Sequence, residues 1–208
     1  MTDMLFKDVD FLRAAYMPES ICDRLRDFFE ENTDDHHKGY SGGKIQEQVK
    51  KSTDLIIENT PFYSEYFWEL QKIIDMYIKE YPTCDEGFPF GITEGCQLQR
   101  YYPSEGYYAW HCERDNNLPR SQDRHLVFMT YLNDVNDAGE TEFYHQKLKV
   151  KPKKGLTVIW PADWTFRHRG IPSPTETKWI CTGWLNYYTP ENWDEKTYGI
   201  KENINESR

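Results

Sequence analysis

The spacing of apolar residues changes at about residue 92, and this change restricts the fold more than any other feature of the sequence. Before it, apolar residues recur at the spacing of one helix face. After it, apolar and polar residues alternate in short runs separated by Pro, Gly, Asn and Asp. Helices do not alternate with these runs, so a parallel sheet is not expected. We predict a mainly β protein with N-terminal helices, folded as a double-sheet jelly roll (a double-stranded β-helix).

The predicted elements can be placed along the chain. Helices are expected over residues 18–32, with Ser20 as the N-cap, and over 61–80, with Pro61 at the first helical position. Strands are expected over residues 95–102, 107–113, 126–132, 141–144, 156–160, 165–168 and 178–188. The polar segment 114–124 is predicted to be a loop over the mouth of a site.

Length and composition limit the classes of protein to consider. The 208 residues suffice for a single domain, with a helical part over about 1–90, a jelly-roll core over about 91–190 and a polar C-terminal tail. The net charge of −10 argues against a nucleic-acid partner. The five cysteines are scattered, and we find neither a signal-peptide pattern nor an apolar run long enough for a membrane span. We therefore predict a cytoplasmic protein without a membrane partner.

The pair formed by His111 and Glu113 is the first candidate chemical site. On an extended strand, residues two apart leave the same face, so Cys112 between them would face the opposite side. A neutral nitrogen of His168 would complete a set of two histidines and one carboxylate. Such a set leaves coordination positions open and suits non-haem Fe(II). Asp115 is an alternative carboxylate ligand, and we favour Glu113.

Lys178 is a single cation in an otherwise strand-like run. A charge that is buried in such a run needs a partner, and the carboxylate of an organic acid is a natural one. Alternation along a strand would direct Ile180, Thr182 and Trp184 to the same side as Lys178. These residues would then line one wall of a ligand site.

A series of ordered motifs runs through residues 95–188. In chain order these are Gln97, Arg100-Tyr101-Tyr102, Tyr108, His111-x-Glu113, Tyr131-Leu132-Asn133-Asp134, Gly139-Glu140-Thr141-Glu142-Phe143, Lys151-Pro152-Lys153-Lys154-Gly155, His168-Arg169-Gly170-Ile171-Pro172, Lys178 and Gly183-Trp184-Leu185. The series resembles the prolyl 4-hydroxylase branch of the Fe(II)/2-oxoglutarate dioxygenases. One position departs from the family, which usually has Asp where this sequence has Glu113.

The resemblance implies a chemistry and a set of site residues. His111, Glu113 and His168 would hold Fe(II), and 2-oxoglutarate and O2 would be the cosubstrates, with ascorbate as a candidate reductant. The reaction would hydroxylate a C–H bond and release succinate and CO2. Residues implied to bind 2-oxoglutarate are Lys178, Tyr131, Tyr102 and Thr182. Residues that border the metal motifs, and are candidates for substrate contact, are Trp110, Arg114, Trp164 and Arg169.

Three functions are compatible with this sequence. The first is hydroxylation of a peptide or protein substrate, with proline as the target that the resemblance implies. The second is the same chemistry on a free amino acid or a nucleic acid, although the segment Thr175-Glu176-Thr177-Lys178 lacks the arginines expected for nucleic acid. The third is a non-catalytic jelly-roll binding module. Titration with iron and 2-oxoglutarate separates the first two functions from the third.

Overall fold

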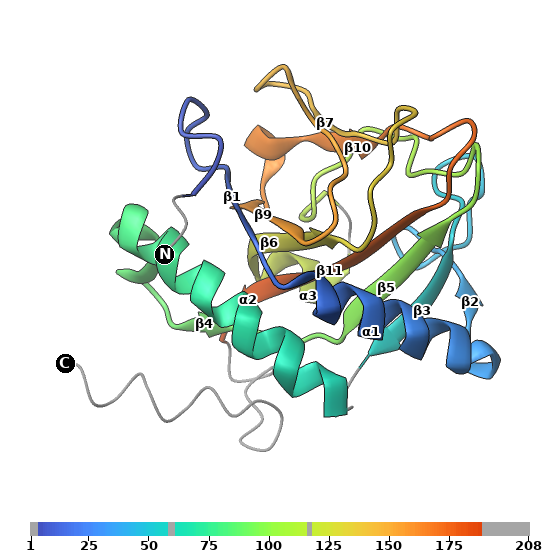
Figure 1. The fold of residues 1–208 in the computed structure, drawn as a ribbon. Helices are drawn as coiled ribbons and strands as arrows, with labels where there is room; N and C mark the ends of the chain where they lie inside the picture. The colour runs from blue at the N-terminus through green and yellow to red at the C-terminus, as the bar shows by residue number, and fades with distance from the viewer. Residues whose placement is uncertain (1–3, 58–60, 116–117, 189–208) are drawn as a thin grey trace.

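The structure is a computed structural model that describes residues 4–57, 61–115 and 118–188 (Figure 1). In these residues the chain forms an eight-stranded sheet and a three-stranded sheet. Every strand pair in both sheets is antiparallel. The mainly β prediction and the exclusion of a parallel sheet are therefore confirmed.

The strand order places segments that are distant in the sequence side by side. The large sheet has the order β1 (Arg13–Tyr16), β9 (Leu156–Pro161), β6 (Arg124–Tyr131), β11 (Lys178–Tyr187), β5 (Cys96–Tyr101), β3 (Thr53–Ile57) and β2 (His37–Lys38). A short strand, β4 (Phe90–Gly91), also pairs with β11. The small sheet has the order β10 (His168–Gly170), β7 (Thr141–Phe143) and β8 (Leu148–Val150). Strand β11 lies between β6 and β5 and is thus a central strand of the large sheet.

Two long helices form where the apolar spacing predicts them. They are α1 (Glu19–Glu31) and α2 (Pro61–Glu80), and both cover the same face of the large sheet (Figure 1). Helix α2 begins at Pro61, as expected for a residue whose missing N–H costs nothing at the first helical position. The predicted cap of α1 is wrong, because Pro18 occupies the N-cap position and no side chain caps the helix.

The large sheet carries a hydrophobic core on each face. One core lies against the helices and the other lies between the two sheets. Strand β11 contributes alternate residues to both, because successive side chains of a strand point to opposite faces. Trp179, Cys181 and Leu185 belong to the helix-side core, whereas Ile180 and Trp184 belong to the core between the sheets.

Several predicted boundaries differ from the structure. Residues 107–113 are not a strand, because they form only two isolated bridges, between Tyr107 and Lys50 and between His111 and His168. Residues 165–168 divide into a 3-10 turn, η3 (Trp164–Phe166), and the start of β10. The predicted loop 114–124 contains a short helix, α3 (Pro119–Gln122). The sequence prediction also missed the short strands β1, β2, β3, β4 and β8.

The remaining elements are two further 3-10 turns, η1 (Thr33–Asp35) and η2 (Pro82–Asp85). The C-terminal tail predicted from Glu191 lies outside the described residues. Within the part of the chain that is described, no helix combines the length and the hydrophobicity needed to cross a bilayer.

Candidate metal and cosubstrate site

A backbone bridge joins the two histidines singled out in the sequence. The N–H of His111 donates to the carbonyl of His168 at 3.0 Å, and the N–H of His168 donates to the carbonyl of His111 at 2.8 Å. This reciprocal pair holds the two imidazole rings with their centroids 4.4 Å apart. His111 and His168 therefore lie side by side, as predicted. A single backbone bridge holds them together, and no longer strand ladder is involved.

Both imidazoles are held in the form that binds a metal. The Nδ1 atom of His111 lies 3.0 Å from the carbonyl of Ala109, and that of His168 lies 2.9 Å from the carbonyl of Phe166. A carbonyl only accepts, so each Nδ1 carries the proton and each Nε2 keeps its lone pair. Burial, reinforced by His168, lowers the pKa of His111 to about 3. His111 is therefore neutral at physiological pH, as metal ligation requires.

Glu113 completes the candidate metal site with the two histidines. Its Oε1 atom lies 3.7 Å from Nε2 of His111 and 3.3 Å from Nε2 of His168. Metal–ligand bonds of about 2.1 Å place adjacent ligands about 3 Å apart, so a modest contraction would close this set around an ion. Burial alone would raise the pKa of Glu113, but its contacts with the two histidines and the positive charge of Arg124 lower it. In the described residues this is the one group of His, Cys, Asp or Glu spaced to hold a metal ion.

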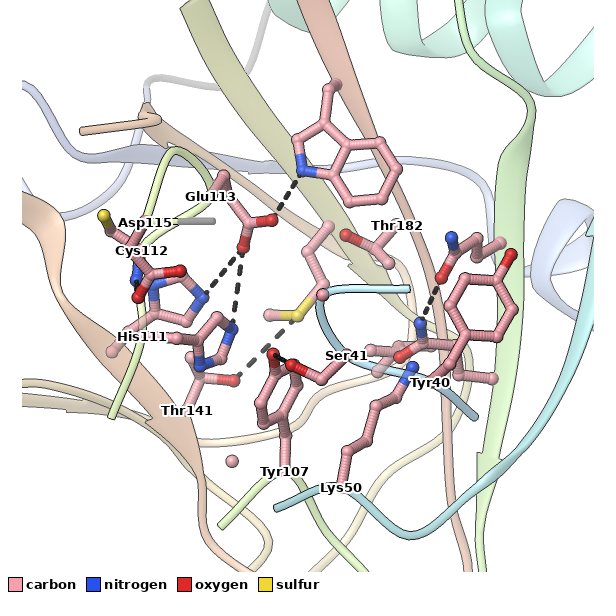
Figure 2. Close-up of a pocket in the computed structure, with 18 of the residues that line it drawn as sticks. Tyr40, Ser41, Lys50, Tyr107, His111, Cys112, Glu113, Asp115, Thr141 and Thr182 are labelled. Atoms are coloured by element: carbon pink, nitrogen blue, oxygen red, sulfur yellow. Dashed lines mark hydrogen bonds and ion pairs between the residues drawn. The ribbon is translucent and has the colours of Figure 1, made fainter. Parts of the chain in front are cut away.

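The alternative carboxylate, Asp115, is directed elsewhere. Its side chain is exposed, and its Oδ2 atom accepts a hydrogen bond from the backbone N–H of Cys112 at 3.0 Å. Cys112 is buried, and its sulfur points away from the three ligand atoms (Figure 2). The geometry thus favours Glu113 over Asp115 and supports the prediction that Cys112 does not face the metal.

A pocket of about 620 Å³ opens beside the three residues (Figure 2). Its wall includes alternate residues of β11, as the strand periodicity predicts: Lys178, Ile180, Thr182 and Trp184. The hydroxyl of Thr182 donates to the carbonyl of Phe128 at 3.0 Å, so this group is satisfied locally while it lines the pocket. Further lining residues come from β5 and β6, among them Gln97, Gln99 and Met129.

Lys178 supplies a buried positive charge to this pocket. Its Nζ atom donates to the carbonyl of Gly139 at 3.0 Å and lies 3.5 Å from that of Ile171. It also lies 5.2 Å from the ring centroid of Tyr101. Among the described residues, no carboxylate stands within ion-pair distance of it. Burial lowers the pKa of Lys178 to about 8, because nothing nearby fully compensates the loss of water.

The two tyrosines predicted to bind the cosubstrate do not line the pocket. Tyr131 is fully buried behind the wall, and its hydroxyl donates to Oγ1 of Thr141 at 2.7 Å. Thr141 lines the pocket in its place. Tyr102 is 47% exposed and stacks under the guanidinium of Arg100 at 4.5 Å. The adjacent Tyr101 lines the pocket instead, because neighbouring residues of β5 point to opposite faces of the sheet.

The four candidates for substrate contact also lie outside the pocket. Trp164 is 69% exposed and Arg114 is exposed. Arg169 stacks on Trp110 at 4.5 Å and forms an ion pair with Glu142 at 2.8 Å. Ring contacts connect a chain of aromatic side chains beside the metal motifs, which we call the outer aromatic cluster: Trp110, Tyr144, His145 and Trp164.

Tyr107 and Lys50 are among the pocket residues that were not anticipated from the sequence. The ring of Tyr107 stacks on that of His111 with centroids 3.6 Å apart, and its hydroxyl lies 2.5 Å from Oγ of Ser41. Lys50 is buried, and its ammonium donates to Asp54 at 2.6 Å. Tyr107 lies among other aromatic residues, and the sequence does not distinguish it from them. Lys50 is followed by a second lysine in a polar segment, so the sequence does not indicate that its side chain is buried. Only the tertiary structure brings them to the site.

Comparison with known proteins agrees with this geometry. Residues 96–186 match the family model described as the 2OG-Fe(II) oxygenase superfamily. Over 164 residues the chain is 28% identical to an Acanthamoeba polyphaga mimivirus protein that carries a prolyl 4-hydroxylase name, covering 70% of this chain and 66% of that protein. Over 151 residues it is 24% identical to subunit alpha-2 of the Gallus gallus prolyl 4-hydroxylase, covering 67% and 26%. The chain thus spans 66% and 26% of the length of these two relatives.

Solved structures share the fold. A Pseudomonas putida prolyl-4-hydroxylase superposes with a TM-score of 0.67 at 16% identity, over 85% of this chain and 92% of that one. A viral collagen prolyl hydroxylase from Paramecium Bursaria Chlorella virus-1, solved as a 2OG complex, gives 0.62 at 22% identity, over 88% and 99%. The match over residues 96–186 agrees with the sequence resemblance to 2OG-Fe(II) oxygenases. The relatives and solved structures to which the chain is similar include prolyl 4-hydroxylases.

Proposed function

We propose that the protein is an Fe(II)- and 2-oxoglutarate-dependent hydroxylase similar to prolyl 4-hydroxylases, releasing succinate and CO2 with each hydroxylation. The observation that carries this proposal is the position of Lys178 in the same pocket as His111, Glu113 and His168. A buried ammonium whose protein contacts are carbonyls is a strong site for a carboxylate. A dicarboxylic acid reaching from the metal to Lys178 would satisfy both ends of the pocket.

Each residue has a defined part in this proposal. His111, Glu113 and His168 would hold the iron and leave positions for the cosubstrate and O2. When bound, iron and 2-oxoglutarate supply the oxidising chemistry, and the protein contributes placement and exclusion of water. Lys178 would bind the distal carboxylate through a charge-assisted hydrogen bond. The hydroxyl of Thr141, which lines the pocket and accepts a hydrogen bond from Tyr131, is a candidate to replace that tyrosine at the cosubstrate.

The proposal also includes the jelly-roll fold, the cytoplasmic location and the reductant. Two antiparallel sheets face each other across the pocket, which favours a double-stranded β-helix supported by α1 and α2. The five cysteines form no disulfide, and four of them are buried, which supports the predicted cytoplasmic location. Ascorbate would serve to restore Fe(II) in turnovers that do not reach a substrate.

A peptide is the substrate class that the surface favours. The outer aromatic cluster adjoins the metal motifs, since Trp110 precedes His111 and Arg169 follows His168. Trp164 and Tyr144 are 69% and 57% exposed, so their rings are available to an extended chain and to the ring of a proline. Arg169 is only half-buried beside Trp110 and adds a hydrogen-bond donor. These features support contact between a peptide and Trp110, Trp164 and Arg169.

The experiment is a coupled assay with Fe(II), 2-oxoglutarate and a panel of proline-containing peptides. We expect a peptide to gain one oxygen atom by mass spectrometry, with succinate formed in equal amount and neither product formed by His168→Ala. Succinate formed only with free amino acids or an oligonucleotide would instead support the second class of substrate. Binding of iron and 2-oxoglutarate with no succinate under any condition would support the non-catalytic module and contradict the proposal.

A further inference from the structure

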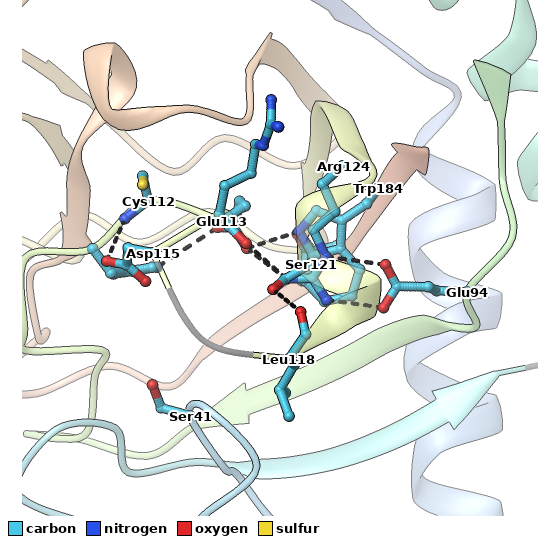
Figure 3. Close-up of polar contacts among 12 residues, drawn as sticks. Ser41, Glu94, Cys112, Glu113, Asp115, Leu118, Ser121, Arg124 and Trp184 are labelled. Carbon is cyan, nitrogen blue, oxygen red and sulfur yellow. Dashed lines mark hydrogen bonds and ion pairs between the residues drawn. The ribbon is translucent and has the colours of Figure 1, made fainter. Parts of the chain in front are cut away.

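The two carboxylate oxygens of Glu113 have different surroundings. Oε1 faces the two histidines, at 3.7 Å and 3.3 Å from their Nε2 atoms. Oε2 points the other way, where it accepts a hydrogen bond from the indole Nε1 of Trp184 at 2.7 Å and lies 3.5 Å from Nη1 of Arg124 (Figure 3). One oxygen is therefore open toward a metal, and the protein already engages the other.

Arg124 is itself held in place. Its guanidinium makes two parallel bonds to Glu94, at 3.0 Å and 2.9 Å, and a third to the backbone carbonyl of Glu113 at 3.2 Å (Figure 3). It also lies 3.5 Å from the ring centroid of Trp184. Asn186 also donates a hydrogen bond to Glu94, at 2.9 Å. The side chains of Arg124, Glu94 and Glu113 are only 13%, 14% and 12% exposed, so these bonds are little weakened by solvent.

We propose that Trp184 and Arg124, with Glu94 behind them, are positioning residues that fix Glu113 as a one-oxygen metal ligand. The inference rests on the metal site of the proposed function. A glutamate has one more rotatable bond than the aspartate usual in this family, so ordering it costs more side-chain entropy. Engaging Oε2 before the metal binds removes that cost and leaves Oε1 as the metal-facing atom.

The same geometry makes the site specific for glutamate. Aspartate at position 113 would withdraw the carboxylate by about 1.5 Å, the length of one C–C bond. From there one oxygen could approach the histidines, but the other would lose the indole N–H. Trp184 and Arg124 would then be left without the acceptor that they share. Reverting to the residue usual in the family should therefore weaken metal binding in this protein.

The test is calorimetric titration of the metal-free protein with Co(II), which is stable in air. Trp184→Phe removes the N–H and keeps a ring under Arg124. Trp179→Phe is the control, because it truncates a buried tryptophan of the same strand on the opposite, helix-side face. We expect Trp184→Phe to weaken Co(II) binding roughly 10- to 100-fold, as loss of a partner of a metal ligand usually does. Trp179→Phe should bind Co(II) like the wild type.

A double-mutant cycle separates positioning from a general loss of stability. Glu113→Asp should weaken Co(II) binding, and adding Trp184→Phe to it should have little further effect, because aspartate does not reach the indole. The visible spectrum of bound Co(II) should also change in Trp184→Phe, since Glu113 becomes free to bind through both oxygens. Glu94→Gln offers an independent variant that leaves Glu113 and Trp184 in place and should weaken Co(II) binding in the same direction.

Two results would overturn the proposal: equal affinities for Trp184→Phe and Trp179→Phe, or fully additive losses in the double mutant. If Trp184→Phe does not fold, Glu94→Gln decides, and wild-type affinity in that variant overturns it. Failure of the metal site itself gives a different result. In that case His111→Ala would bind Co(II) as tightly as the wild type.

Discussion

Replacing Lys178 should impair cosubstrate binding more than iron binding. Lys178 is 4% exposed, and its ammonium contacts the carbonyls of Gly139 and Ile171. Removing one partner of a buried charge pair costs about 2–5 kcal/mol, much of it because the other charge is left unpaired. We therefore expect Lys178→Ala to weaken 2-oxoglutarate binding roughly 30- to 4,000-fold. Iron affinity should change little, because the ammonium is not one of the three clustered ligands.

The assay is a calorimetric titration with 2-oxoglutarate in the absence of oxygen, with iron occupancy measured in every variant. Lys178→Met keeps the length of the side chain without its charge, and it should lose as much affinity as Lys178→Ala. Lys178→Arg should recover part of the loss, since a planar guanidinium does not occupy the position of a compact ammonium. Equal affinity in the wild type and Lys178→Met would refute the reasoning, because it would show that the charge does not bind the cosubstrate.

Three further predictions concern the metal, pH and stability. His111→Ala, His168→Ala and Glu113→Ala should each abolish tight Fe(II) binding in a metal assay while Asp115→Ala retains it; the opposite result for the two carboxylates would make Asp115 the ligand. The pKa of Lys178 is lowered to about 8, and only the protonated side chain attracts a carboxylate. The affinity for 2-oxoglutarate should therefore be constant below pH 8 and fall about tenfold per pH unit above it. Lys178→Arg stays charged and should lack this fall, and a fall shared by both proteins would exclude Lys178 as its cause. Gly183→Ala would push a methyl group into the ring of Phe128, so it should lower the free energy of unfolding by about 1–3 kcal/mol. Chemical denaturation measures this change, and an unchanged midpoint would show that the helix-side core can adapt.

Strand β11 was predictable because its side chains follow a strict alternation. Lys178, Thr182 and Trp184 line the pocket, as a period of two requires. Helix α2 was predictable for a similar reason, since a long run with helical spacing begins at a proline. In both cases the pattern is local and long enough to determine which face is buried.

The ligand segment was harder to predict because its structure depends on distant partners. Residues 107–113 have strand-like composition, yet Tyr107 bridges to Lys50 and His111 bridges to His168, so no continuous ladder forms. Tyr102 was predicted from the family resemblance, and a resemblance between motifs does not determine which side of β5 faces the pocket. Arg124 and Glu94 gave no sequence signal as a pair, because only the folding of the large sheet brings them together.

The central claim is that this pocket uses iron and 2-oxoglutarate together. Its most direct test is succinate formation from 2-oxoglutarate by the metal-free protein, measured before and after addition of Fe(II). We predict that succinate appears only with Fe(II), is lost in His168→Ala and falls sharply in Lys178→Ala at low 2-oxoglutarate. Succinate formation that persists without iron, or that is unaffected by His168→Ala, would contradict the account.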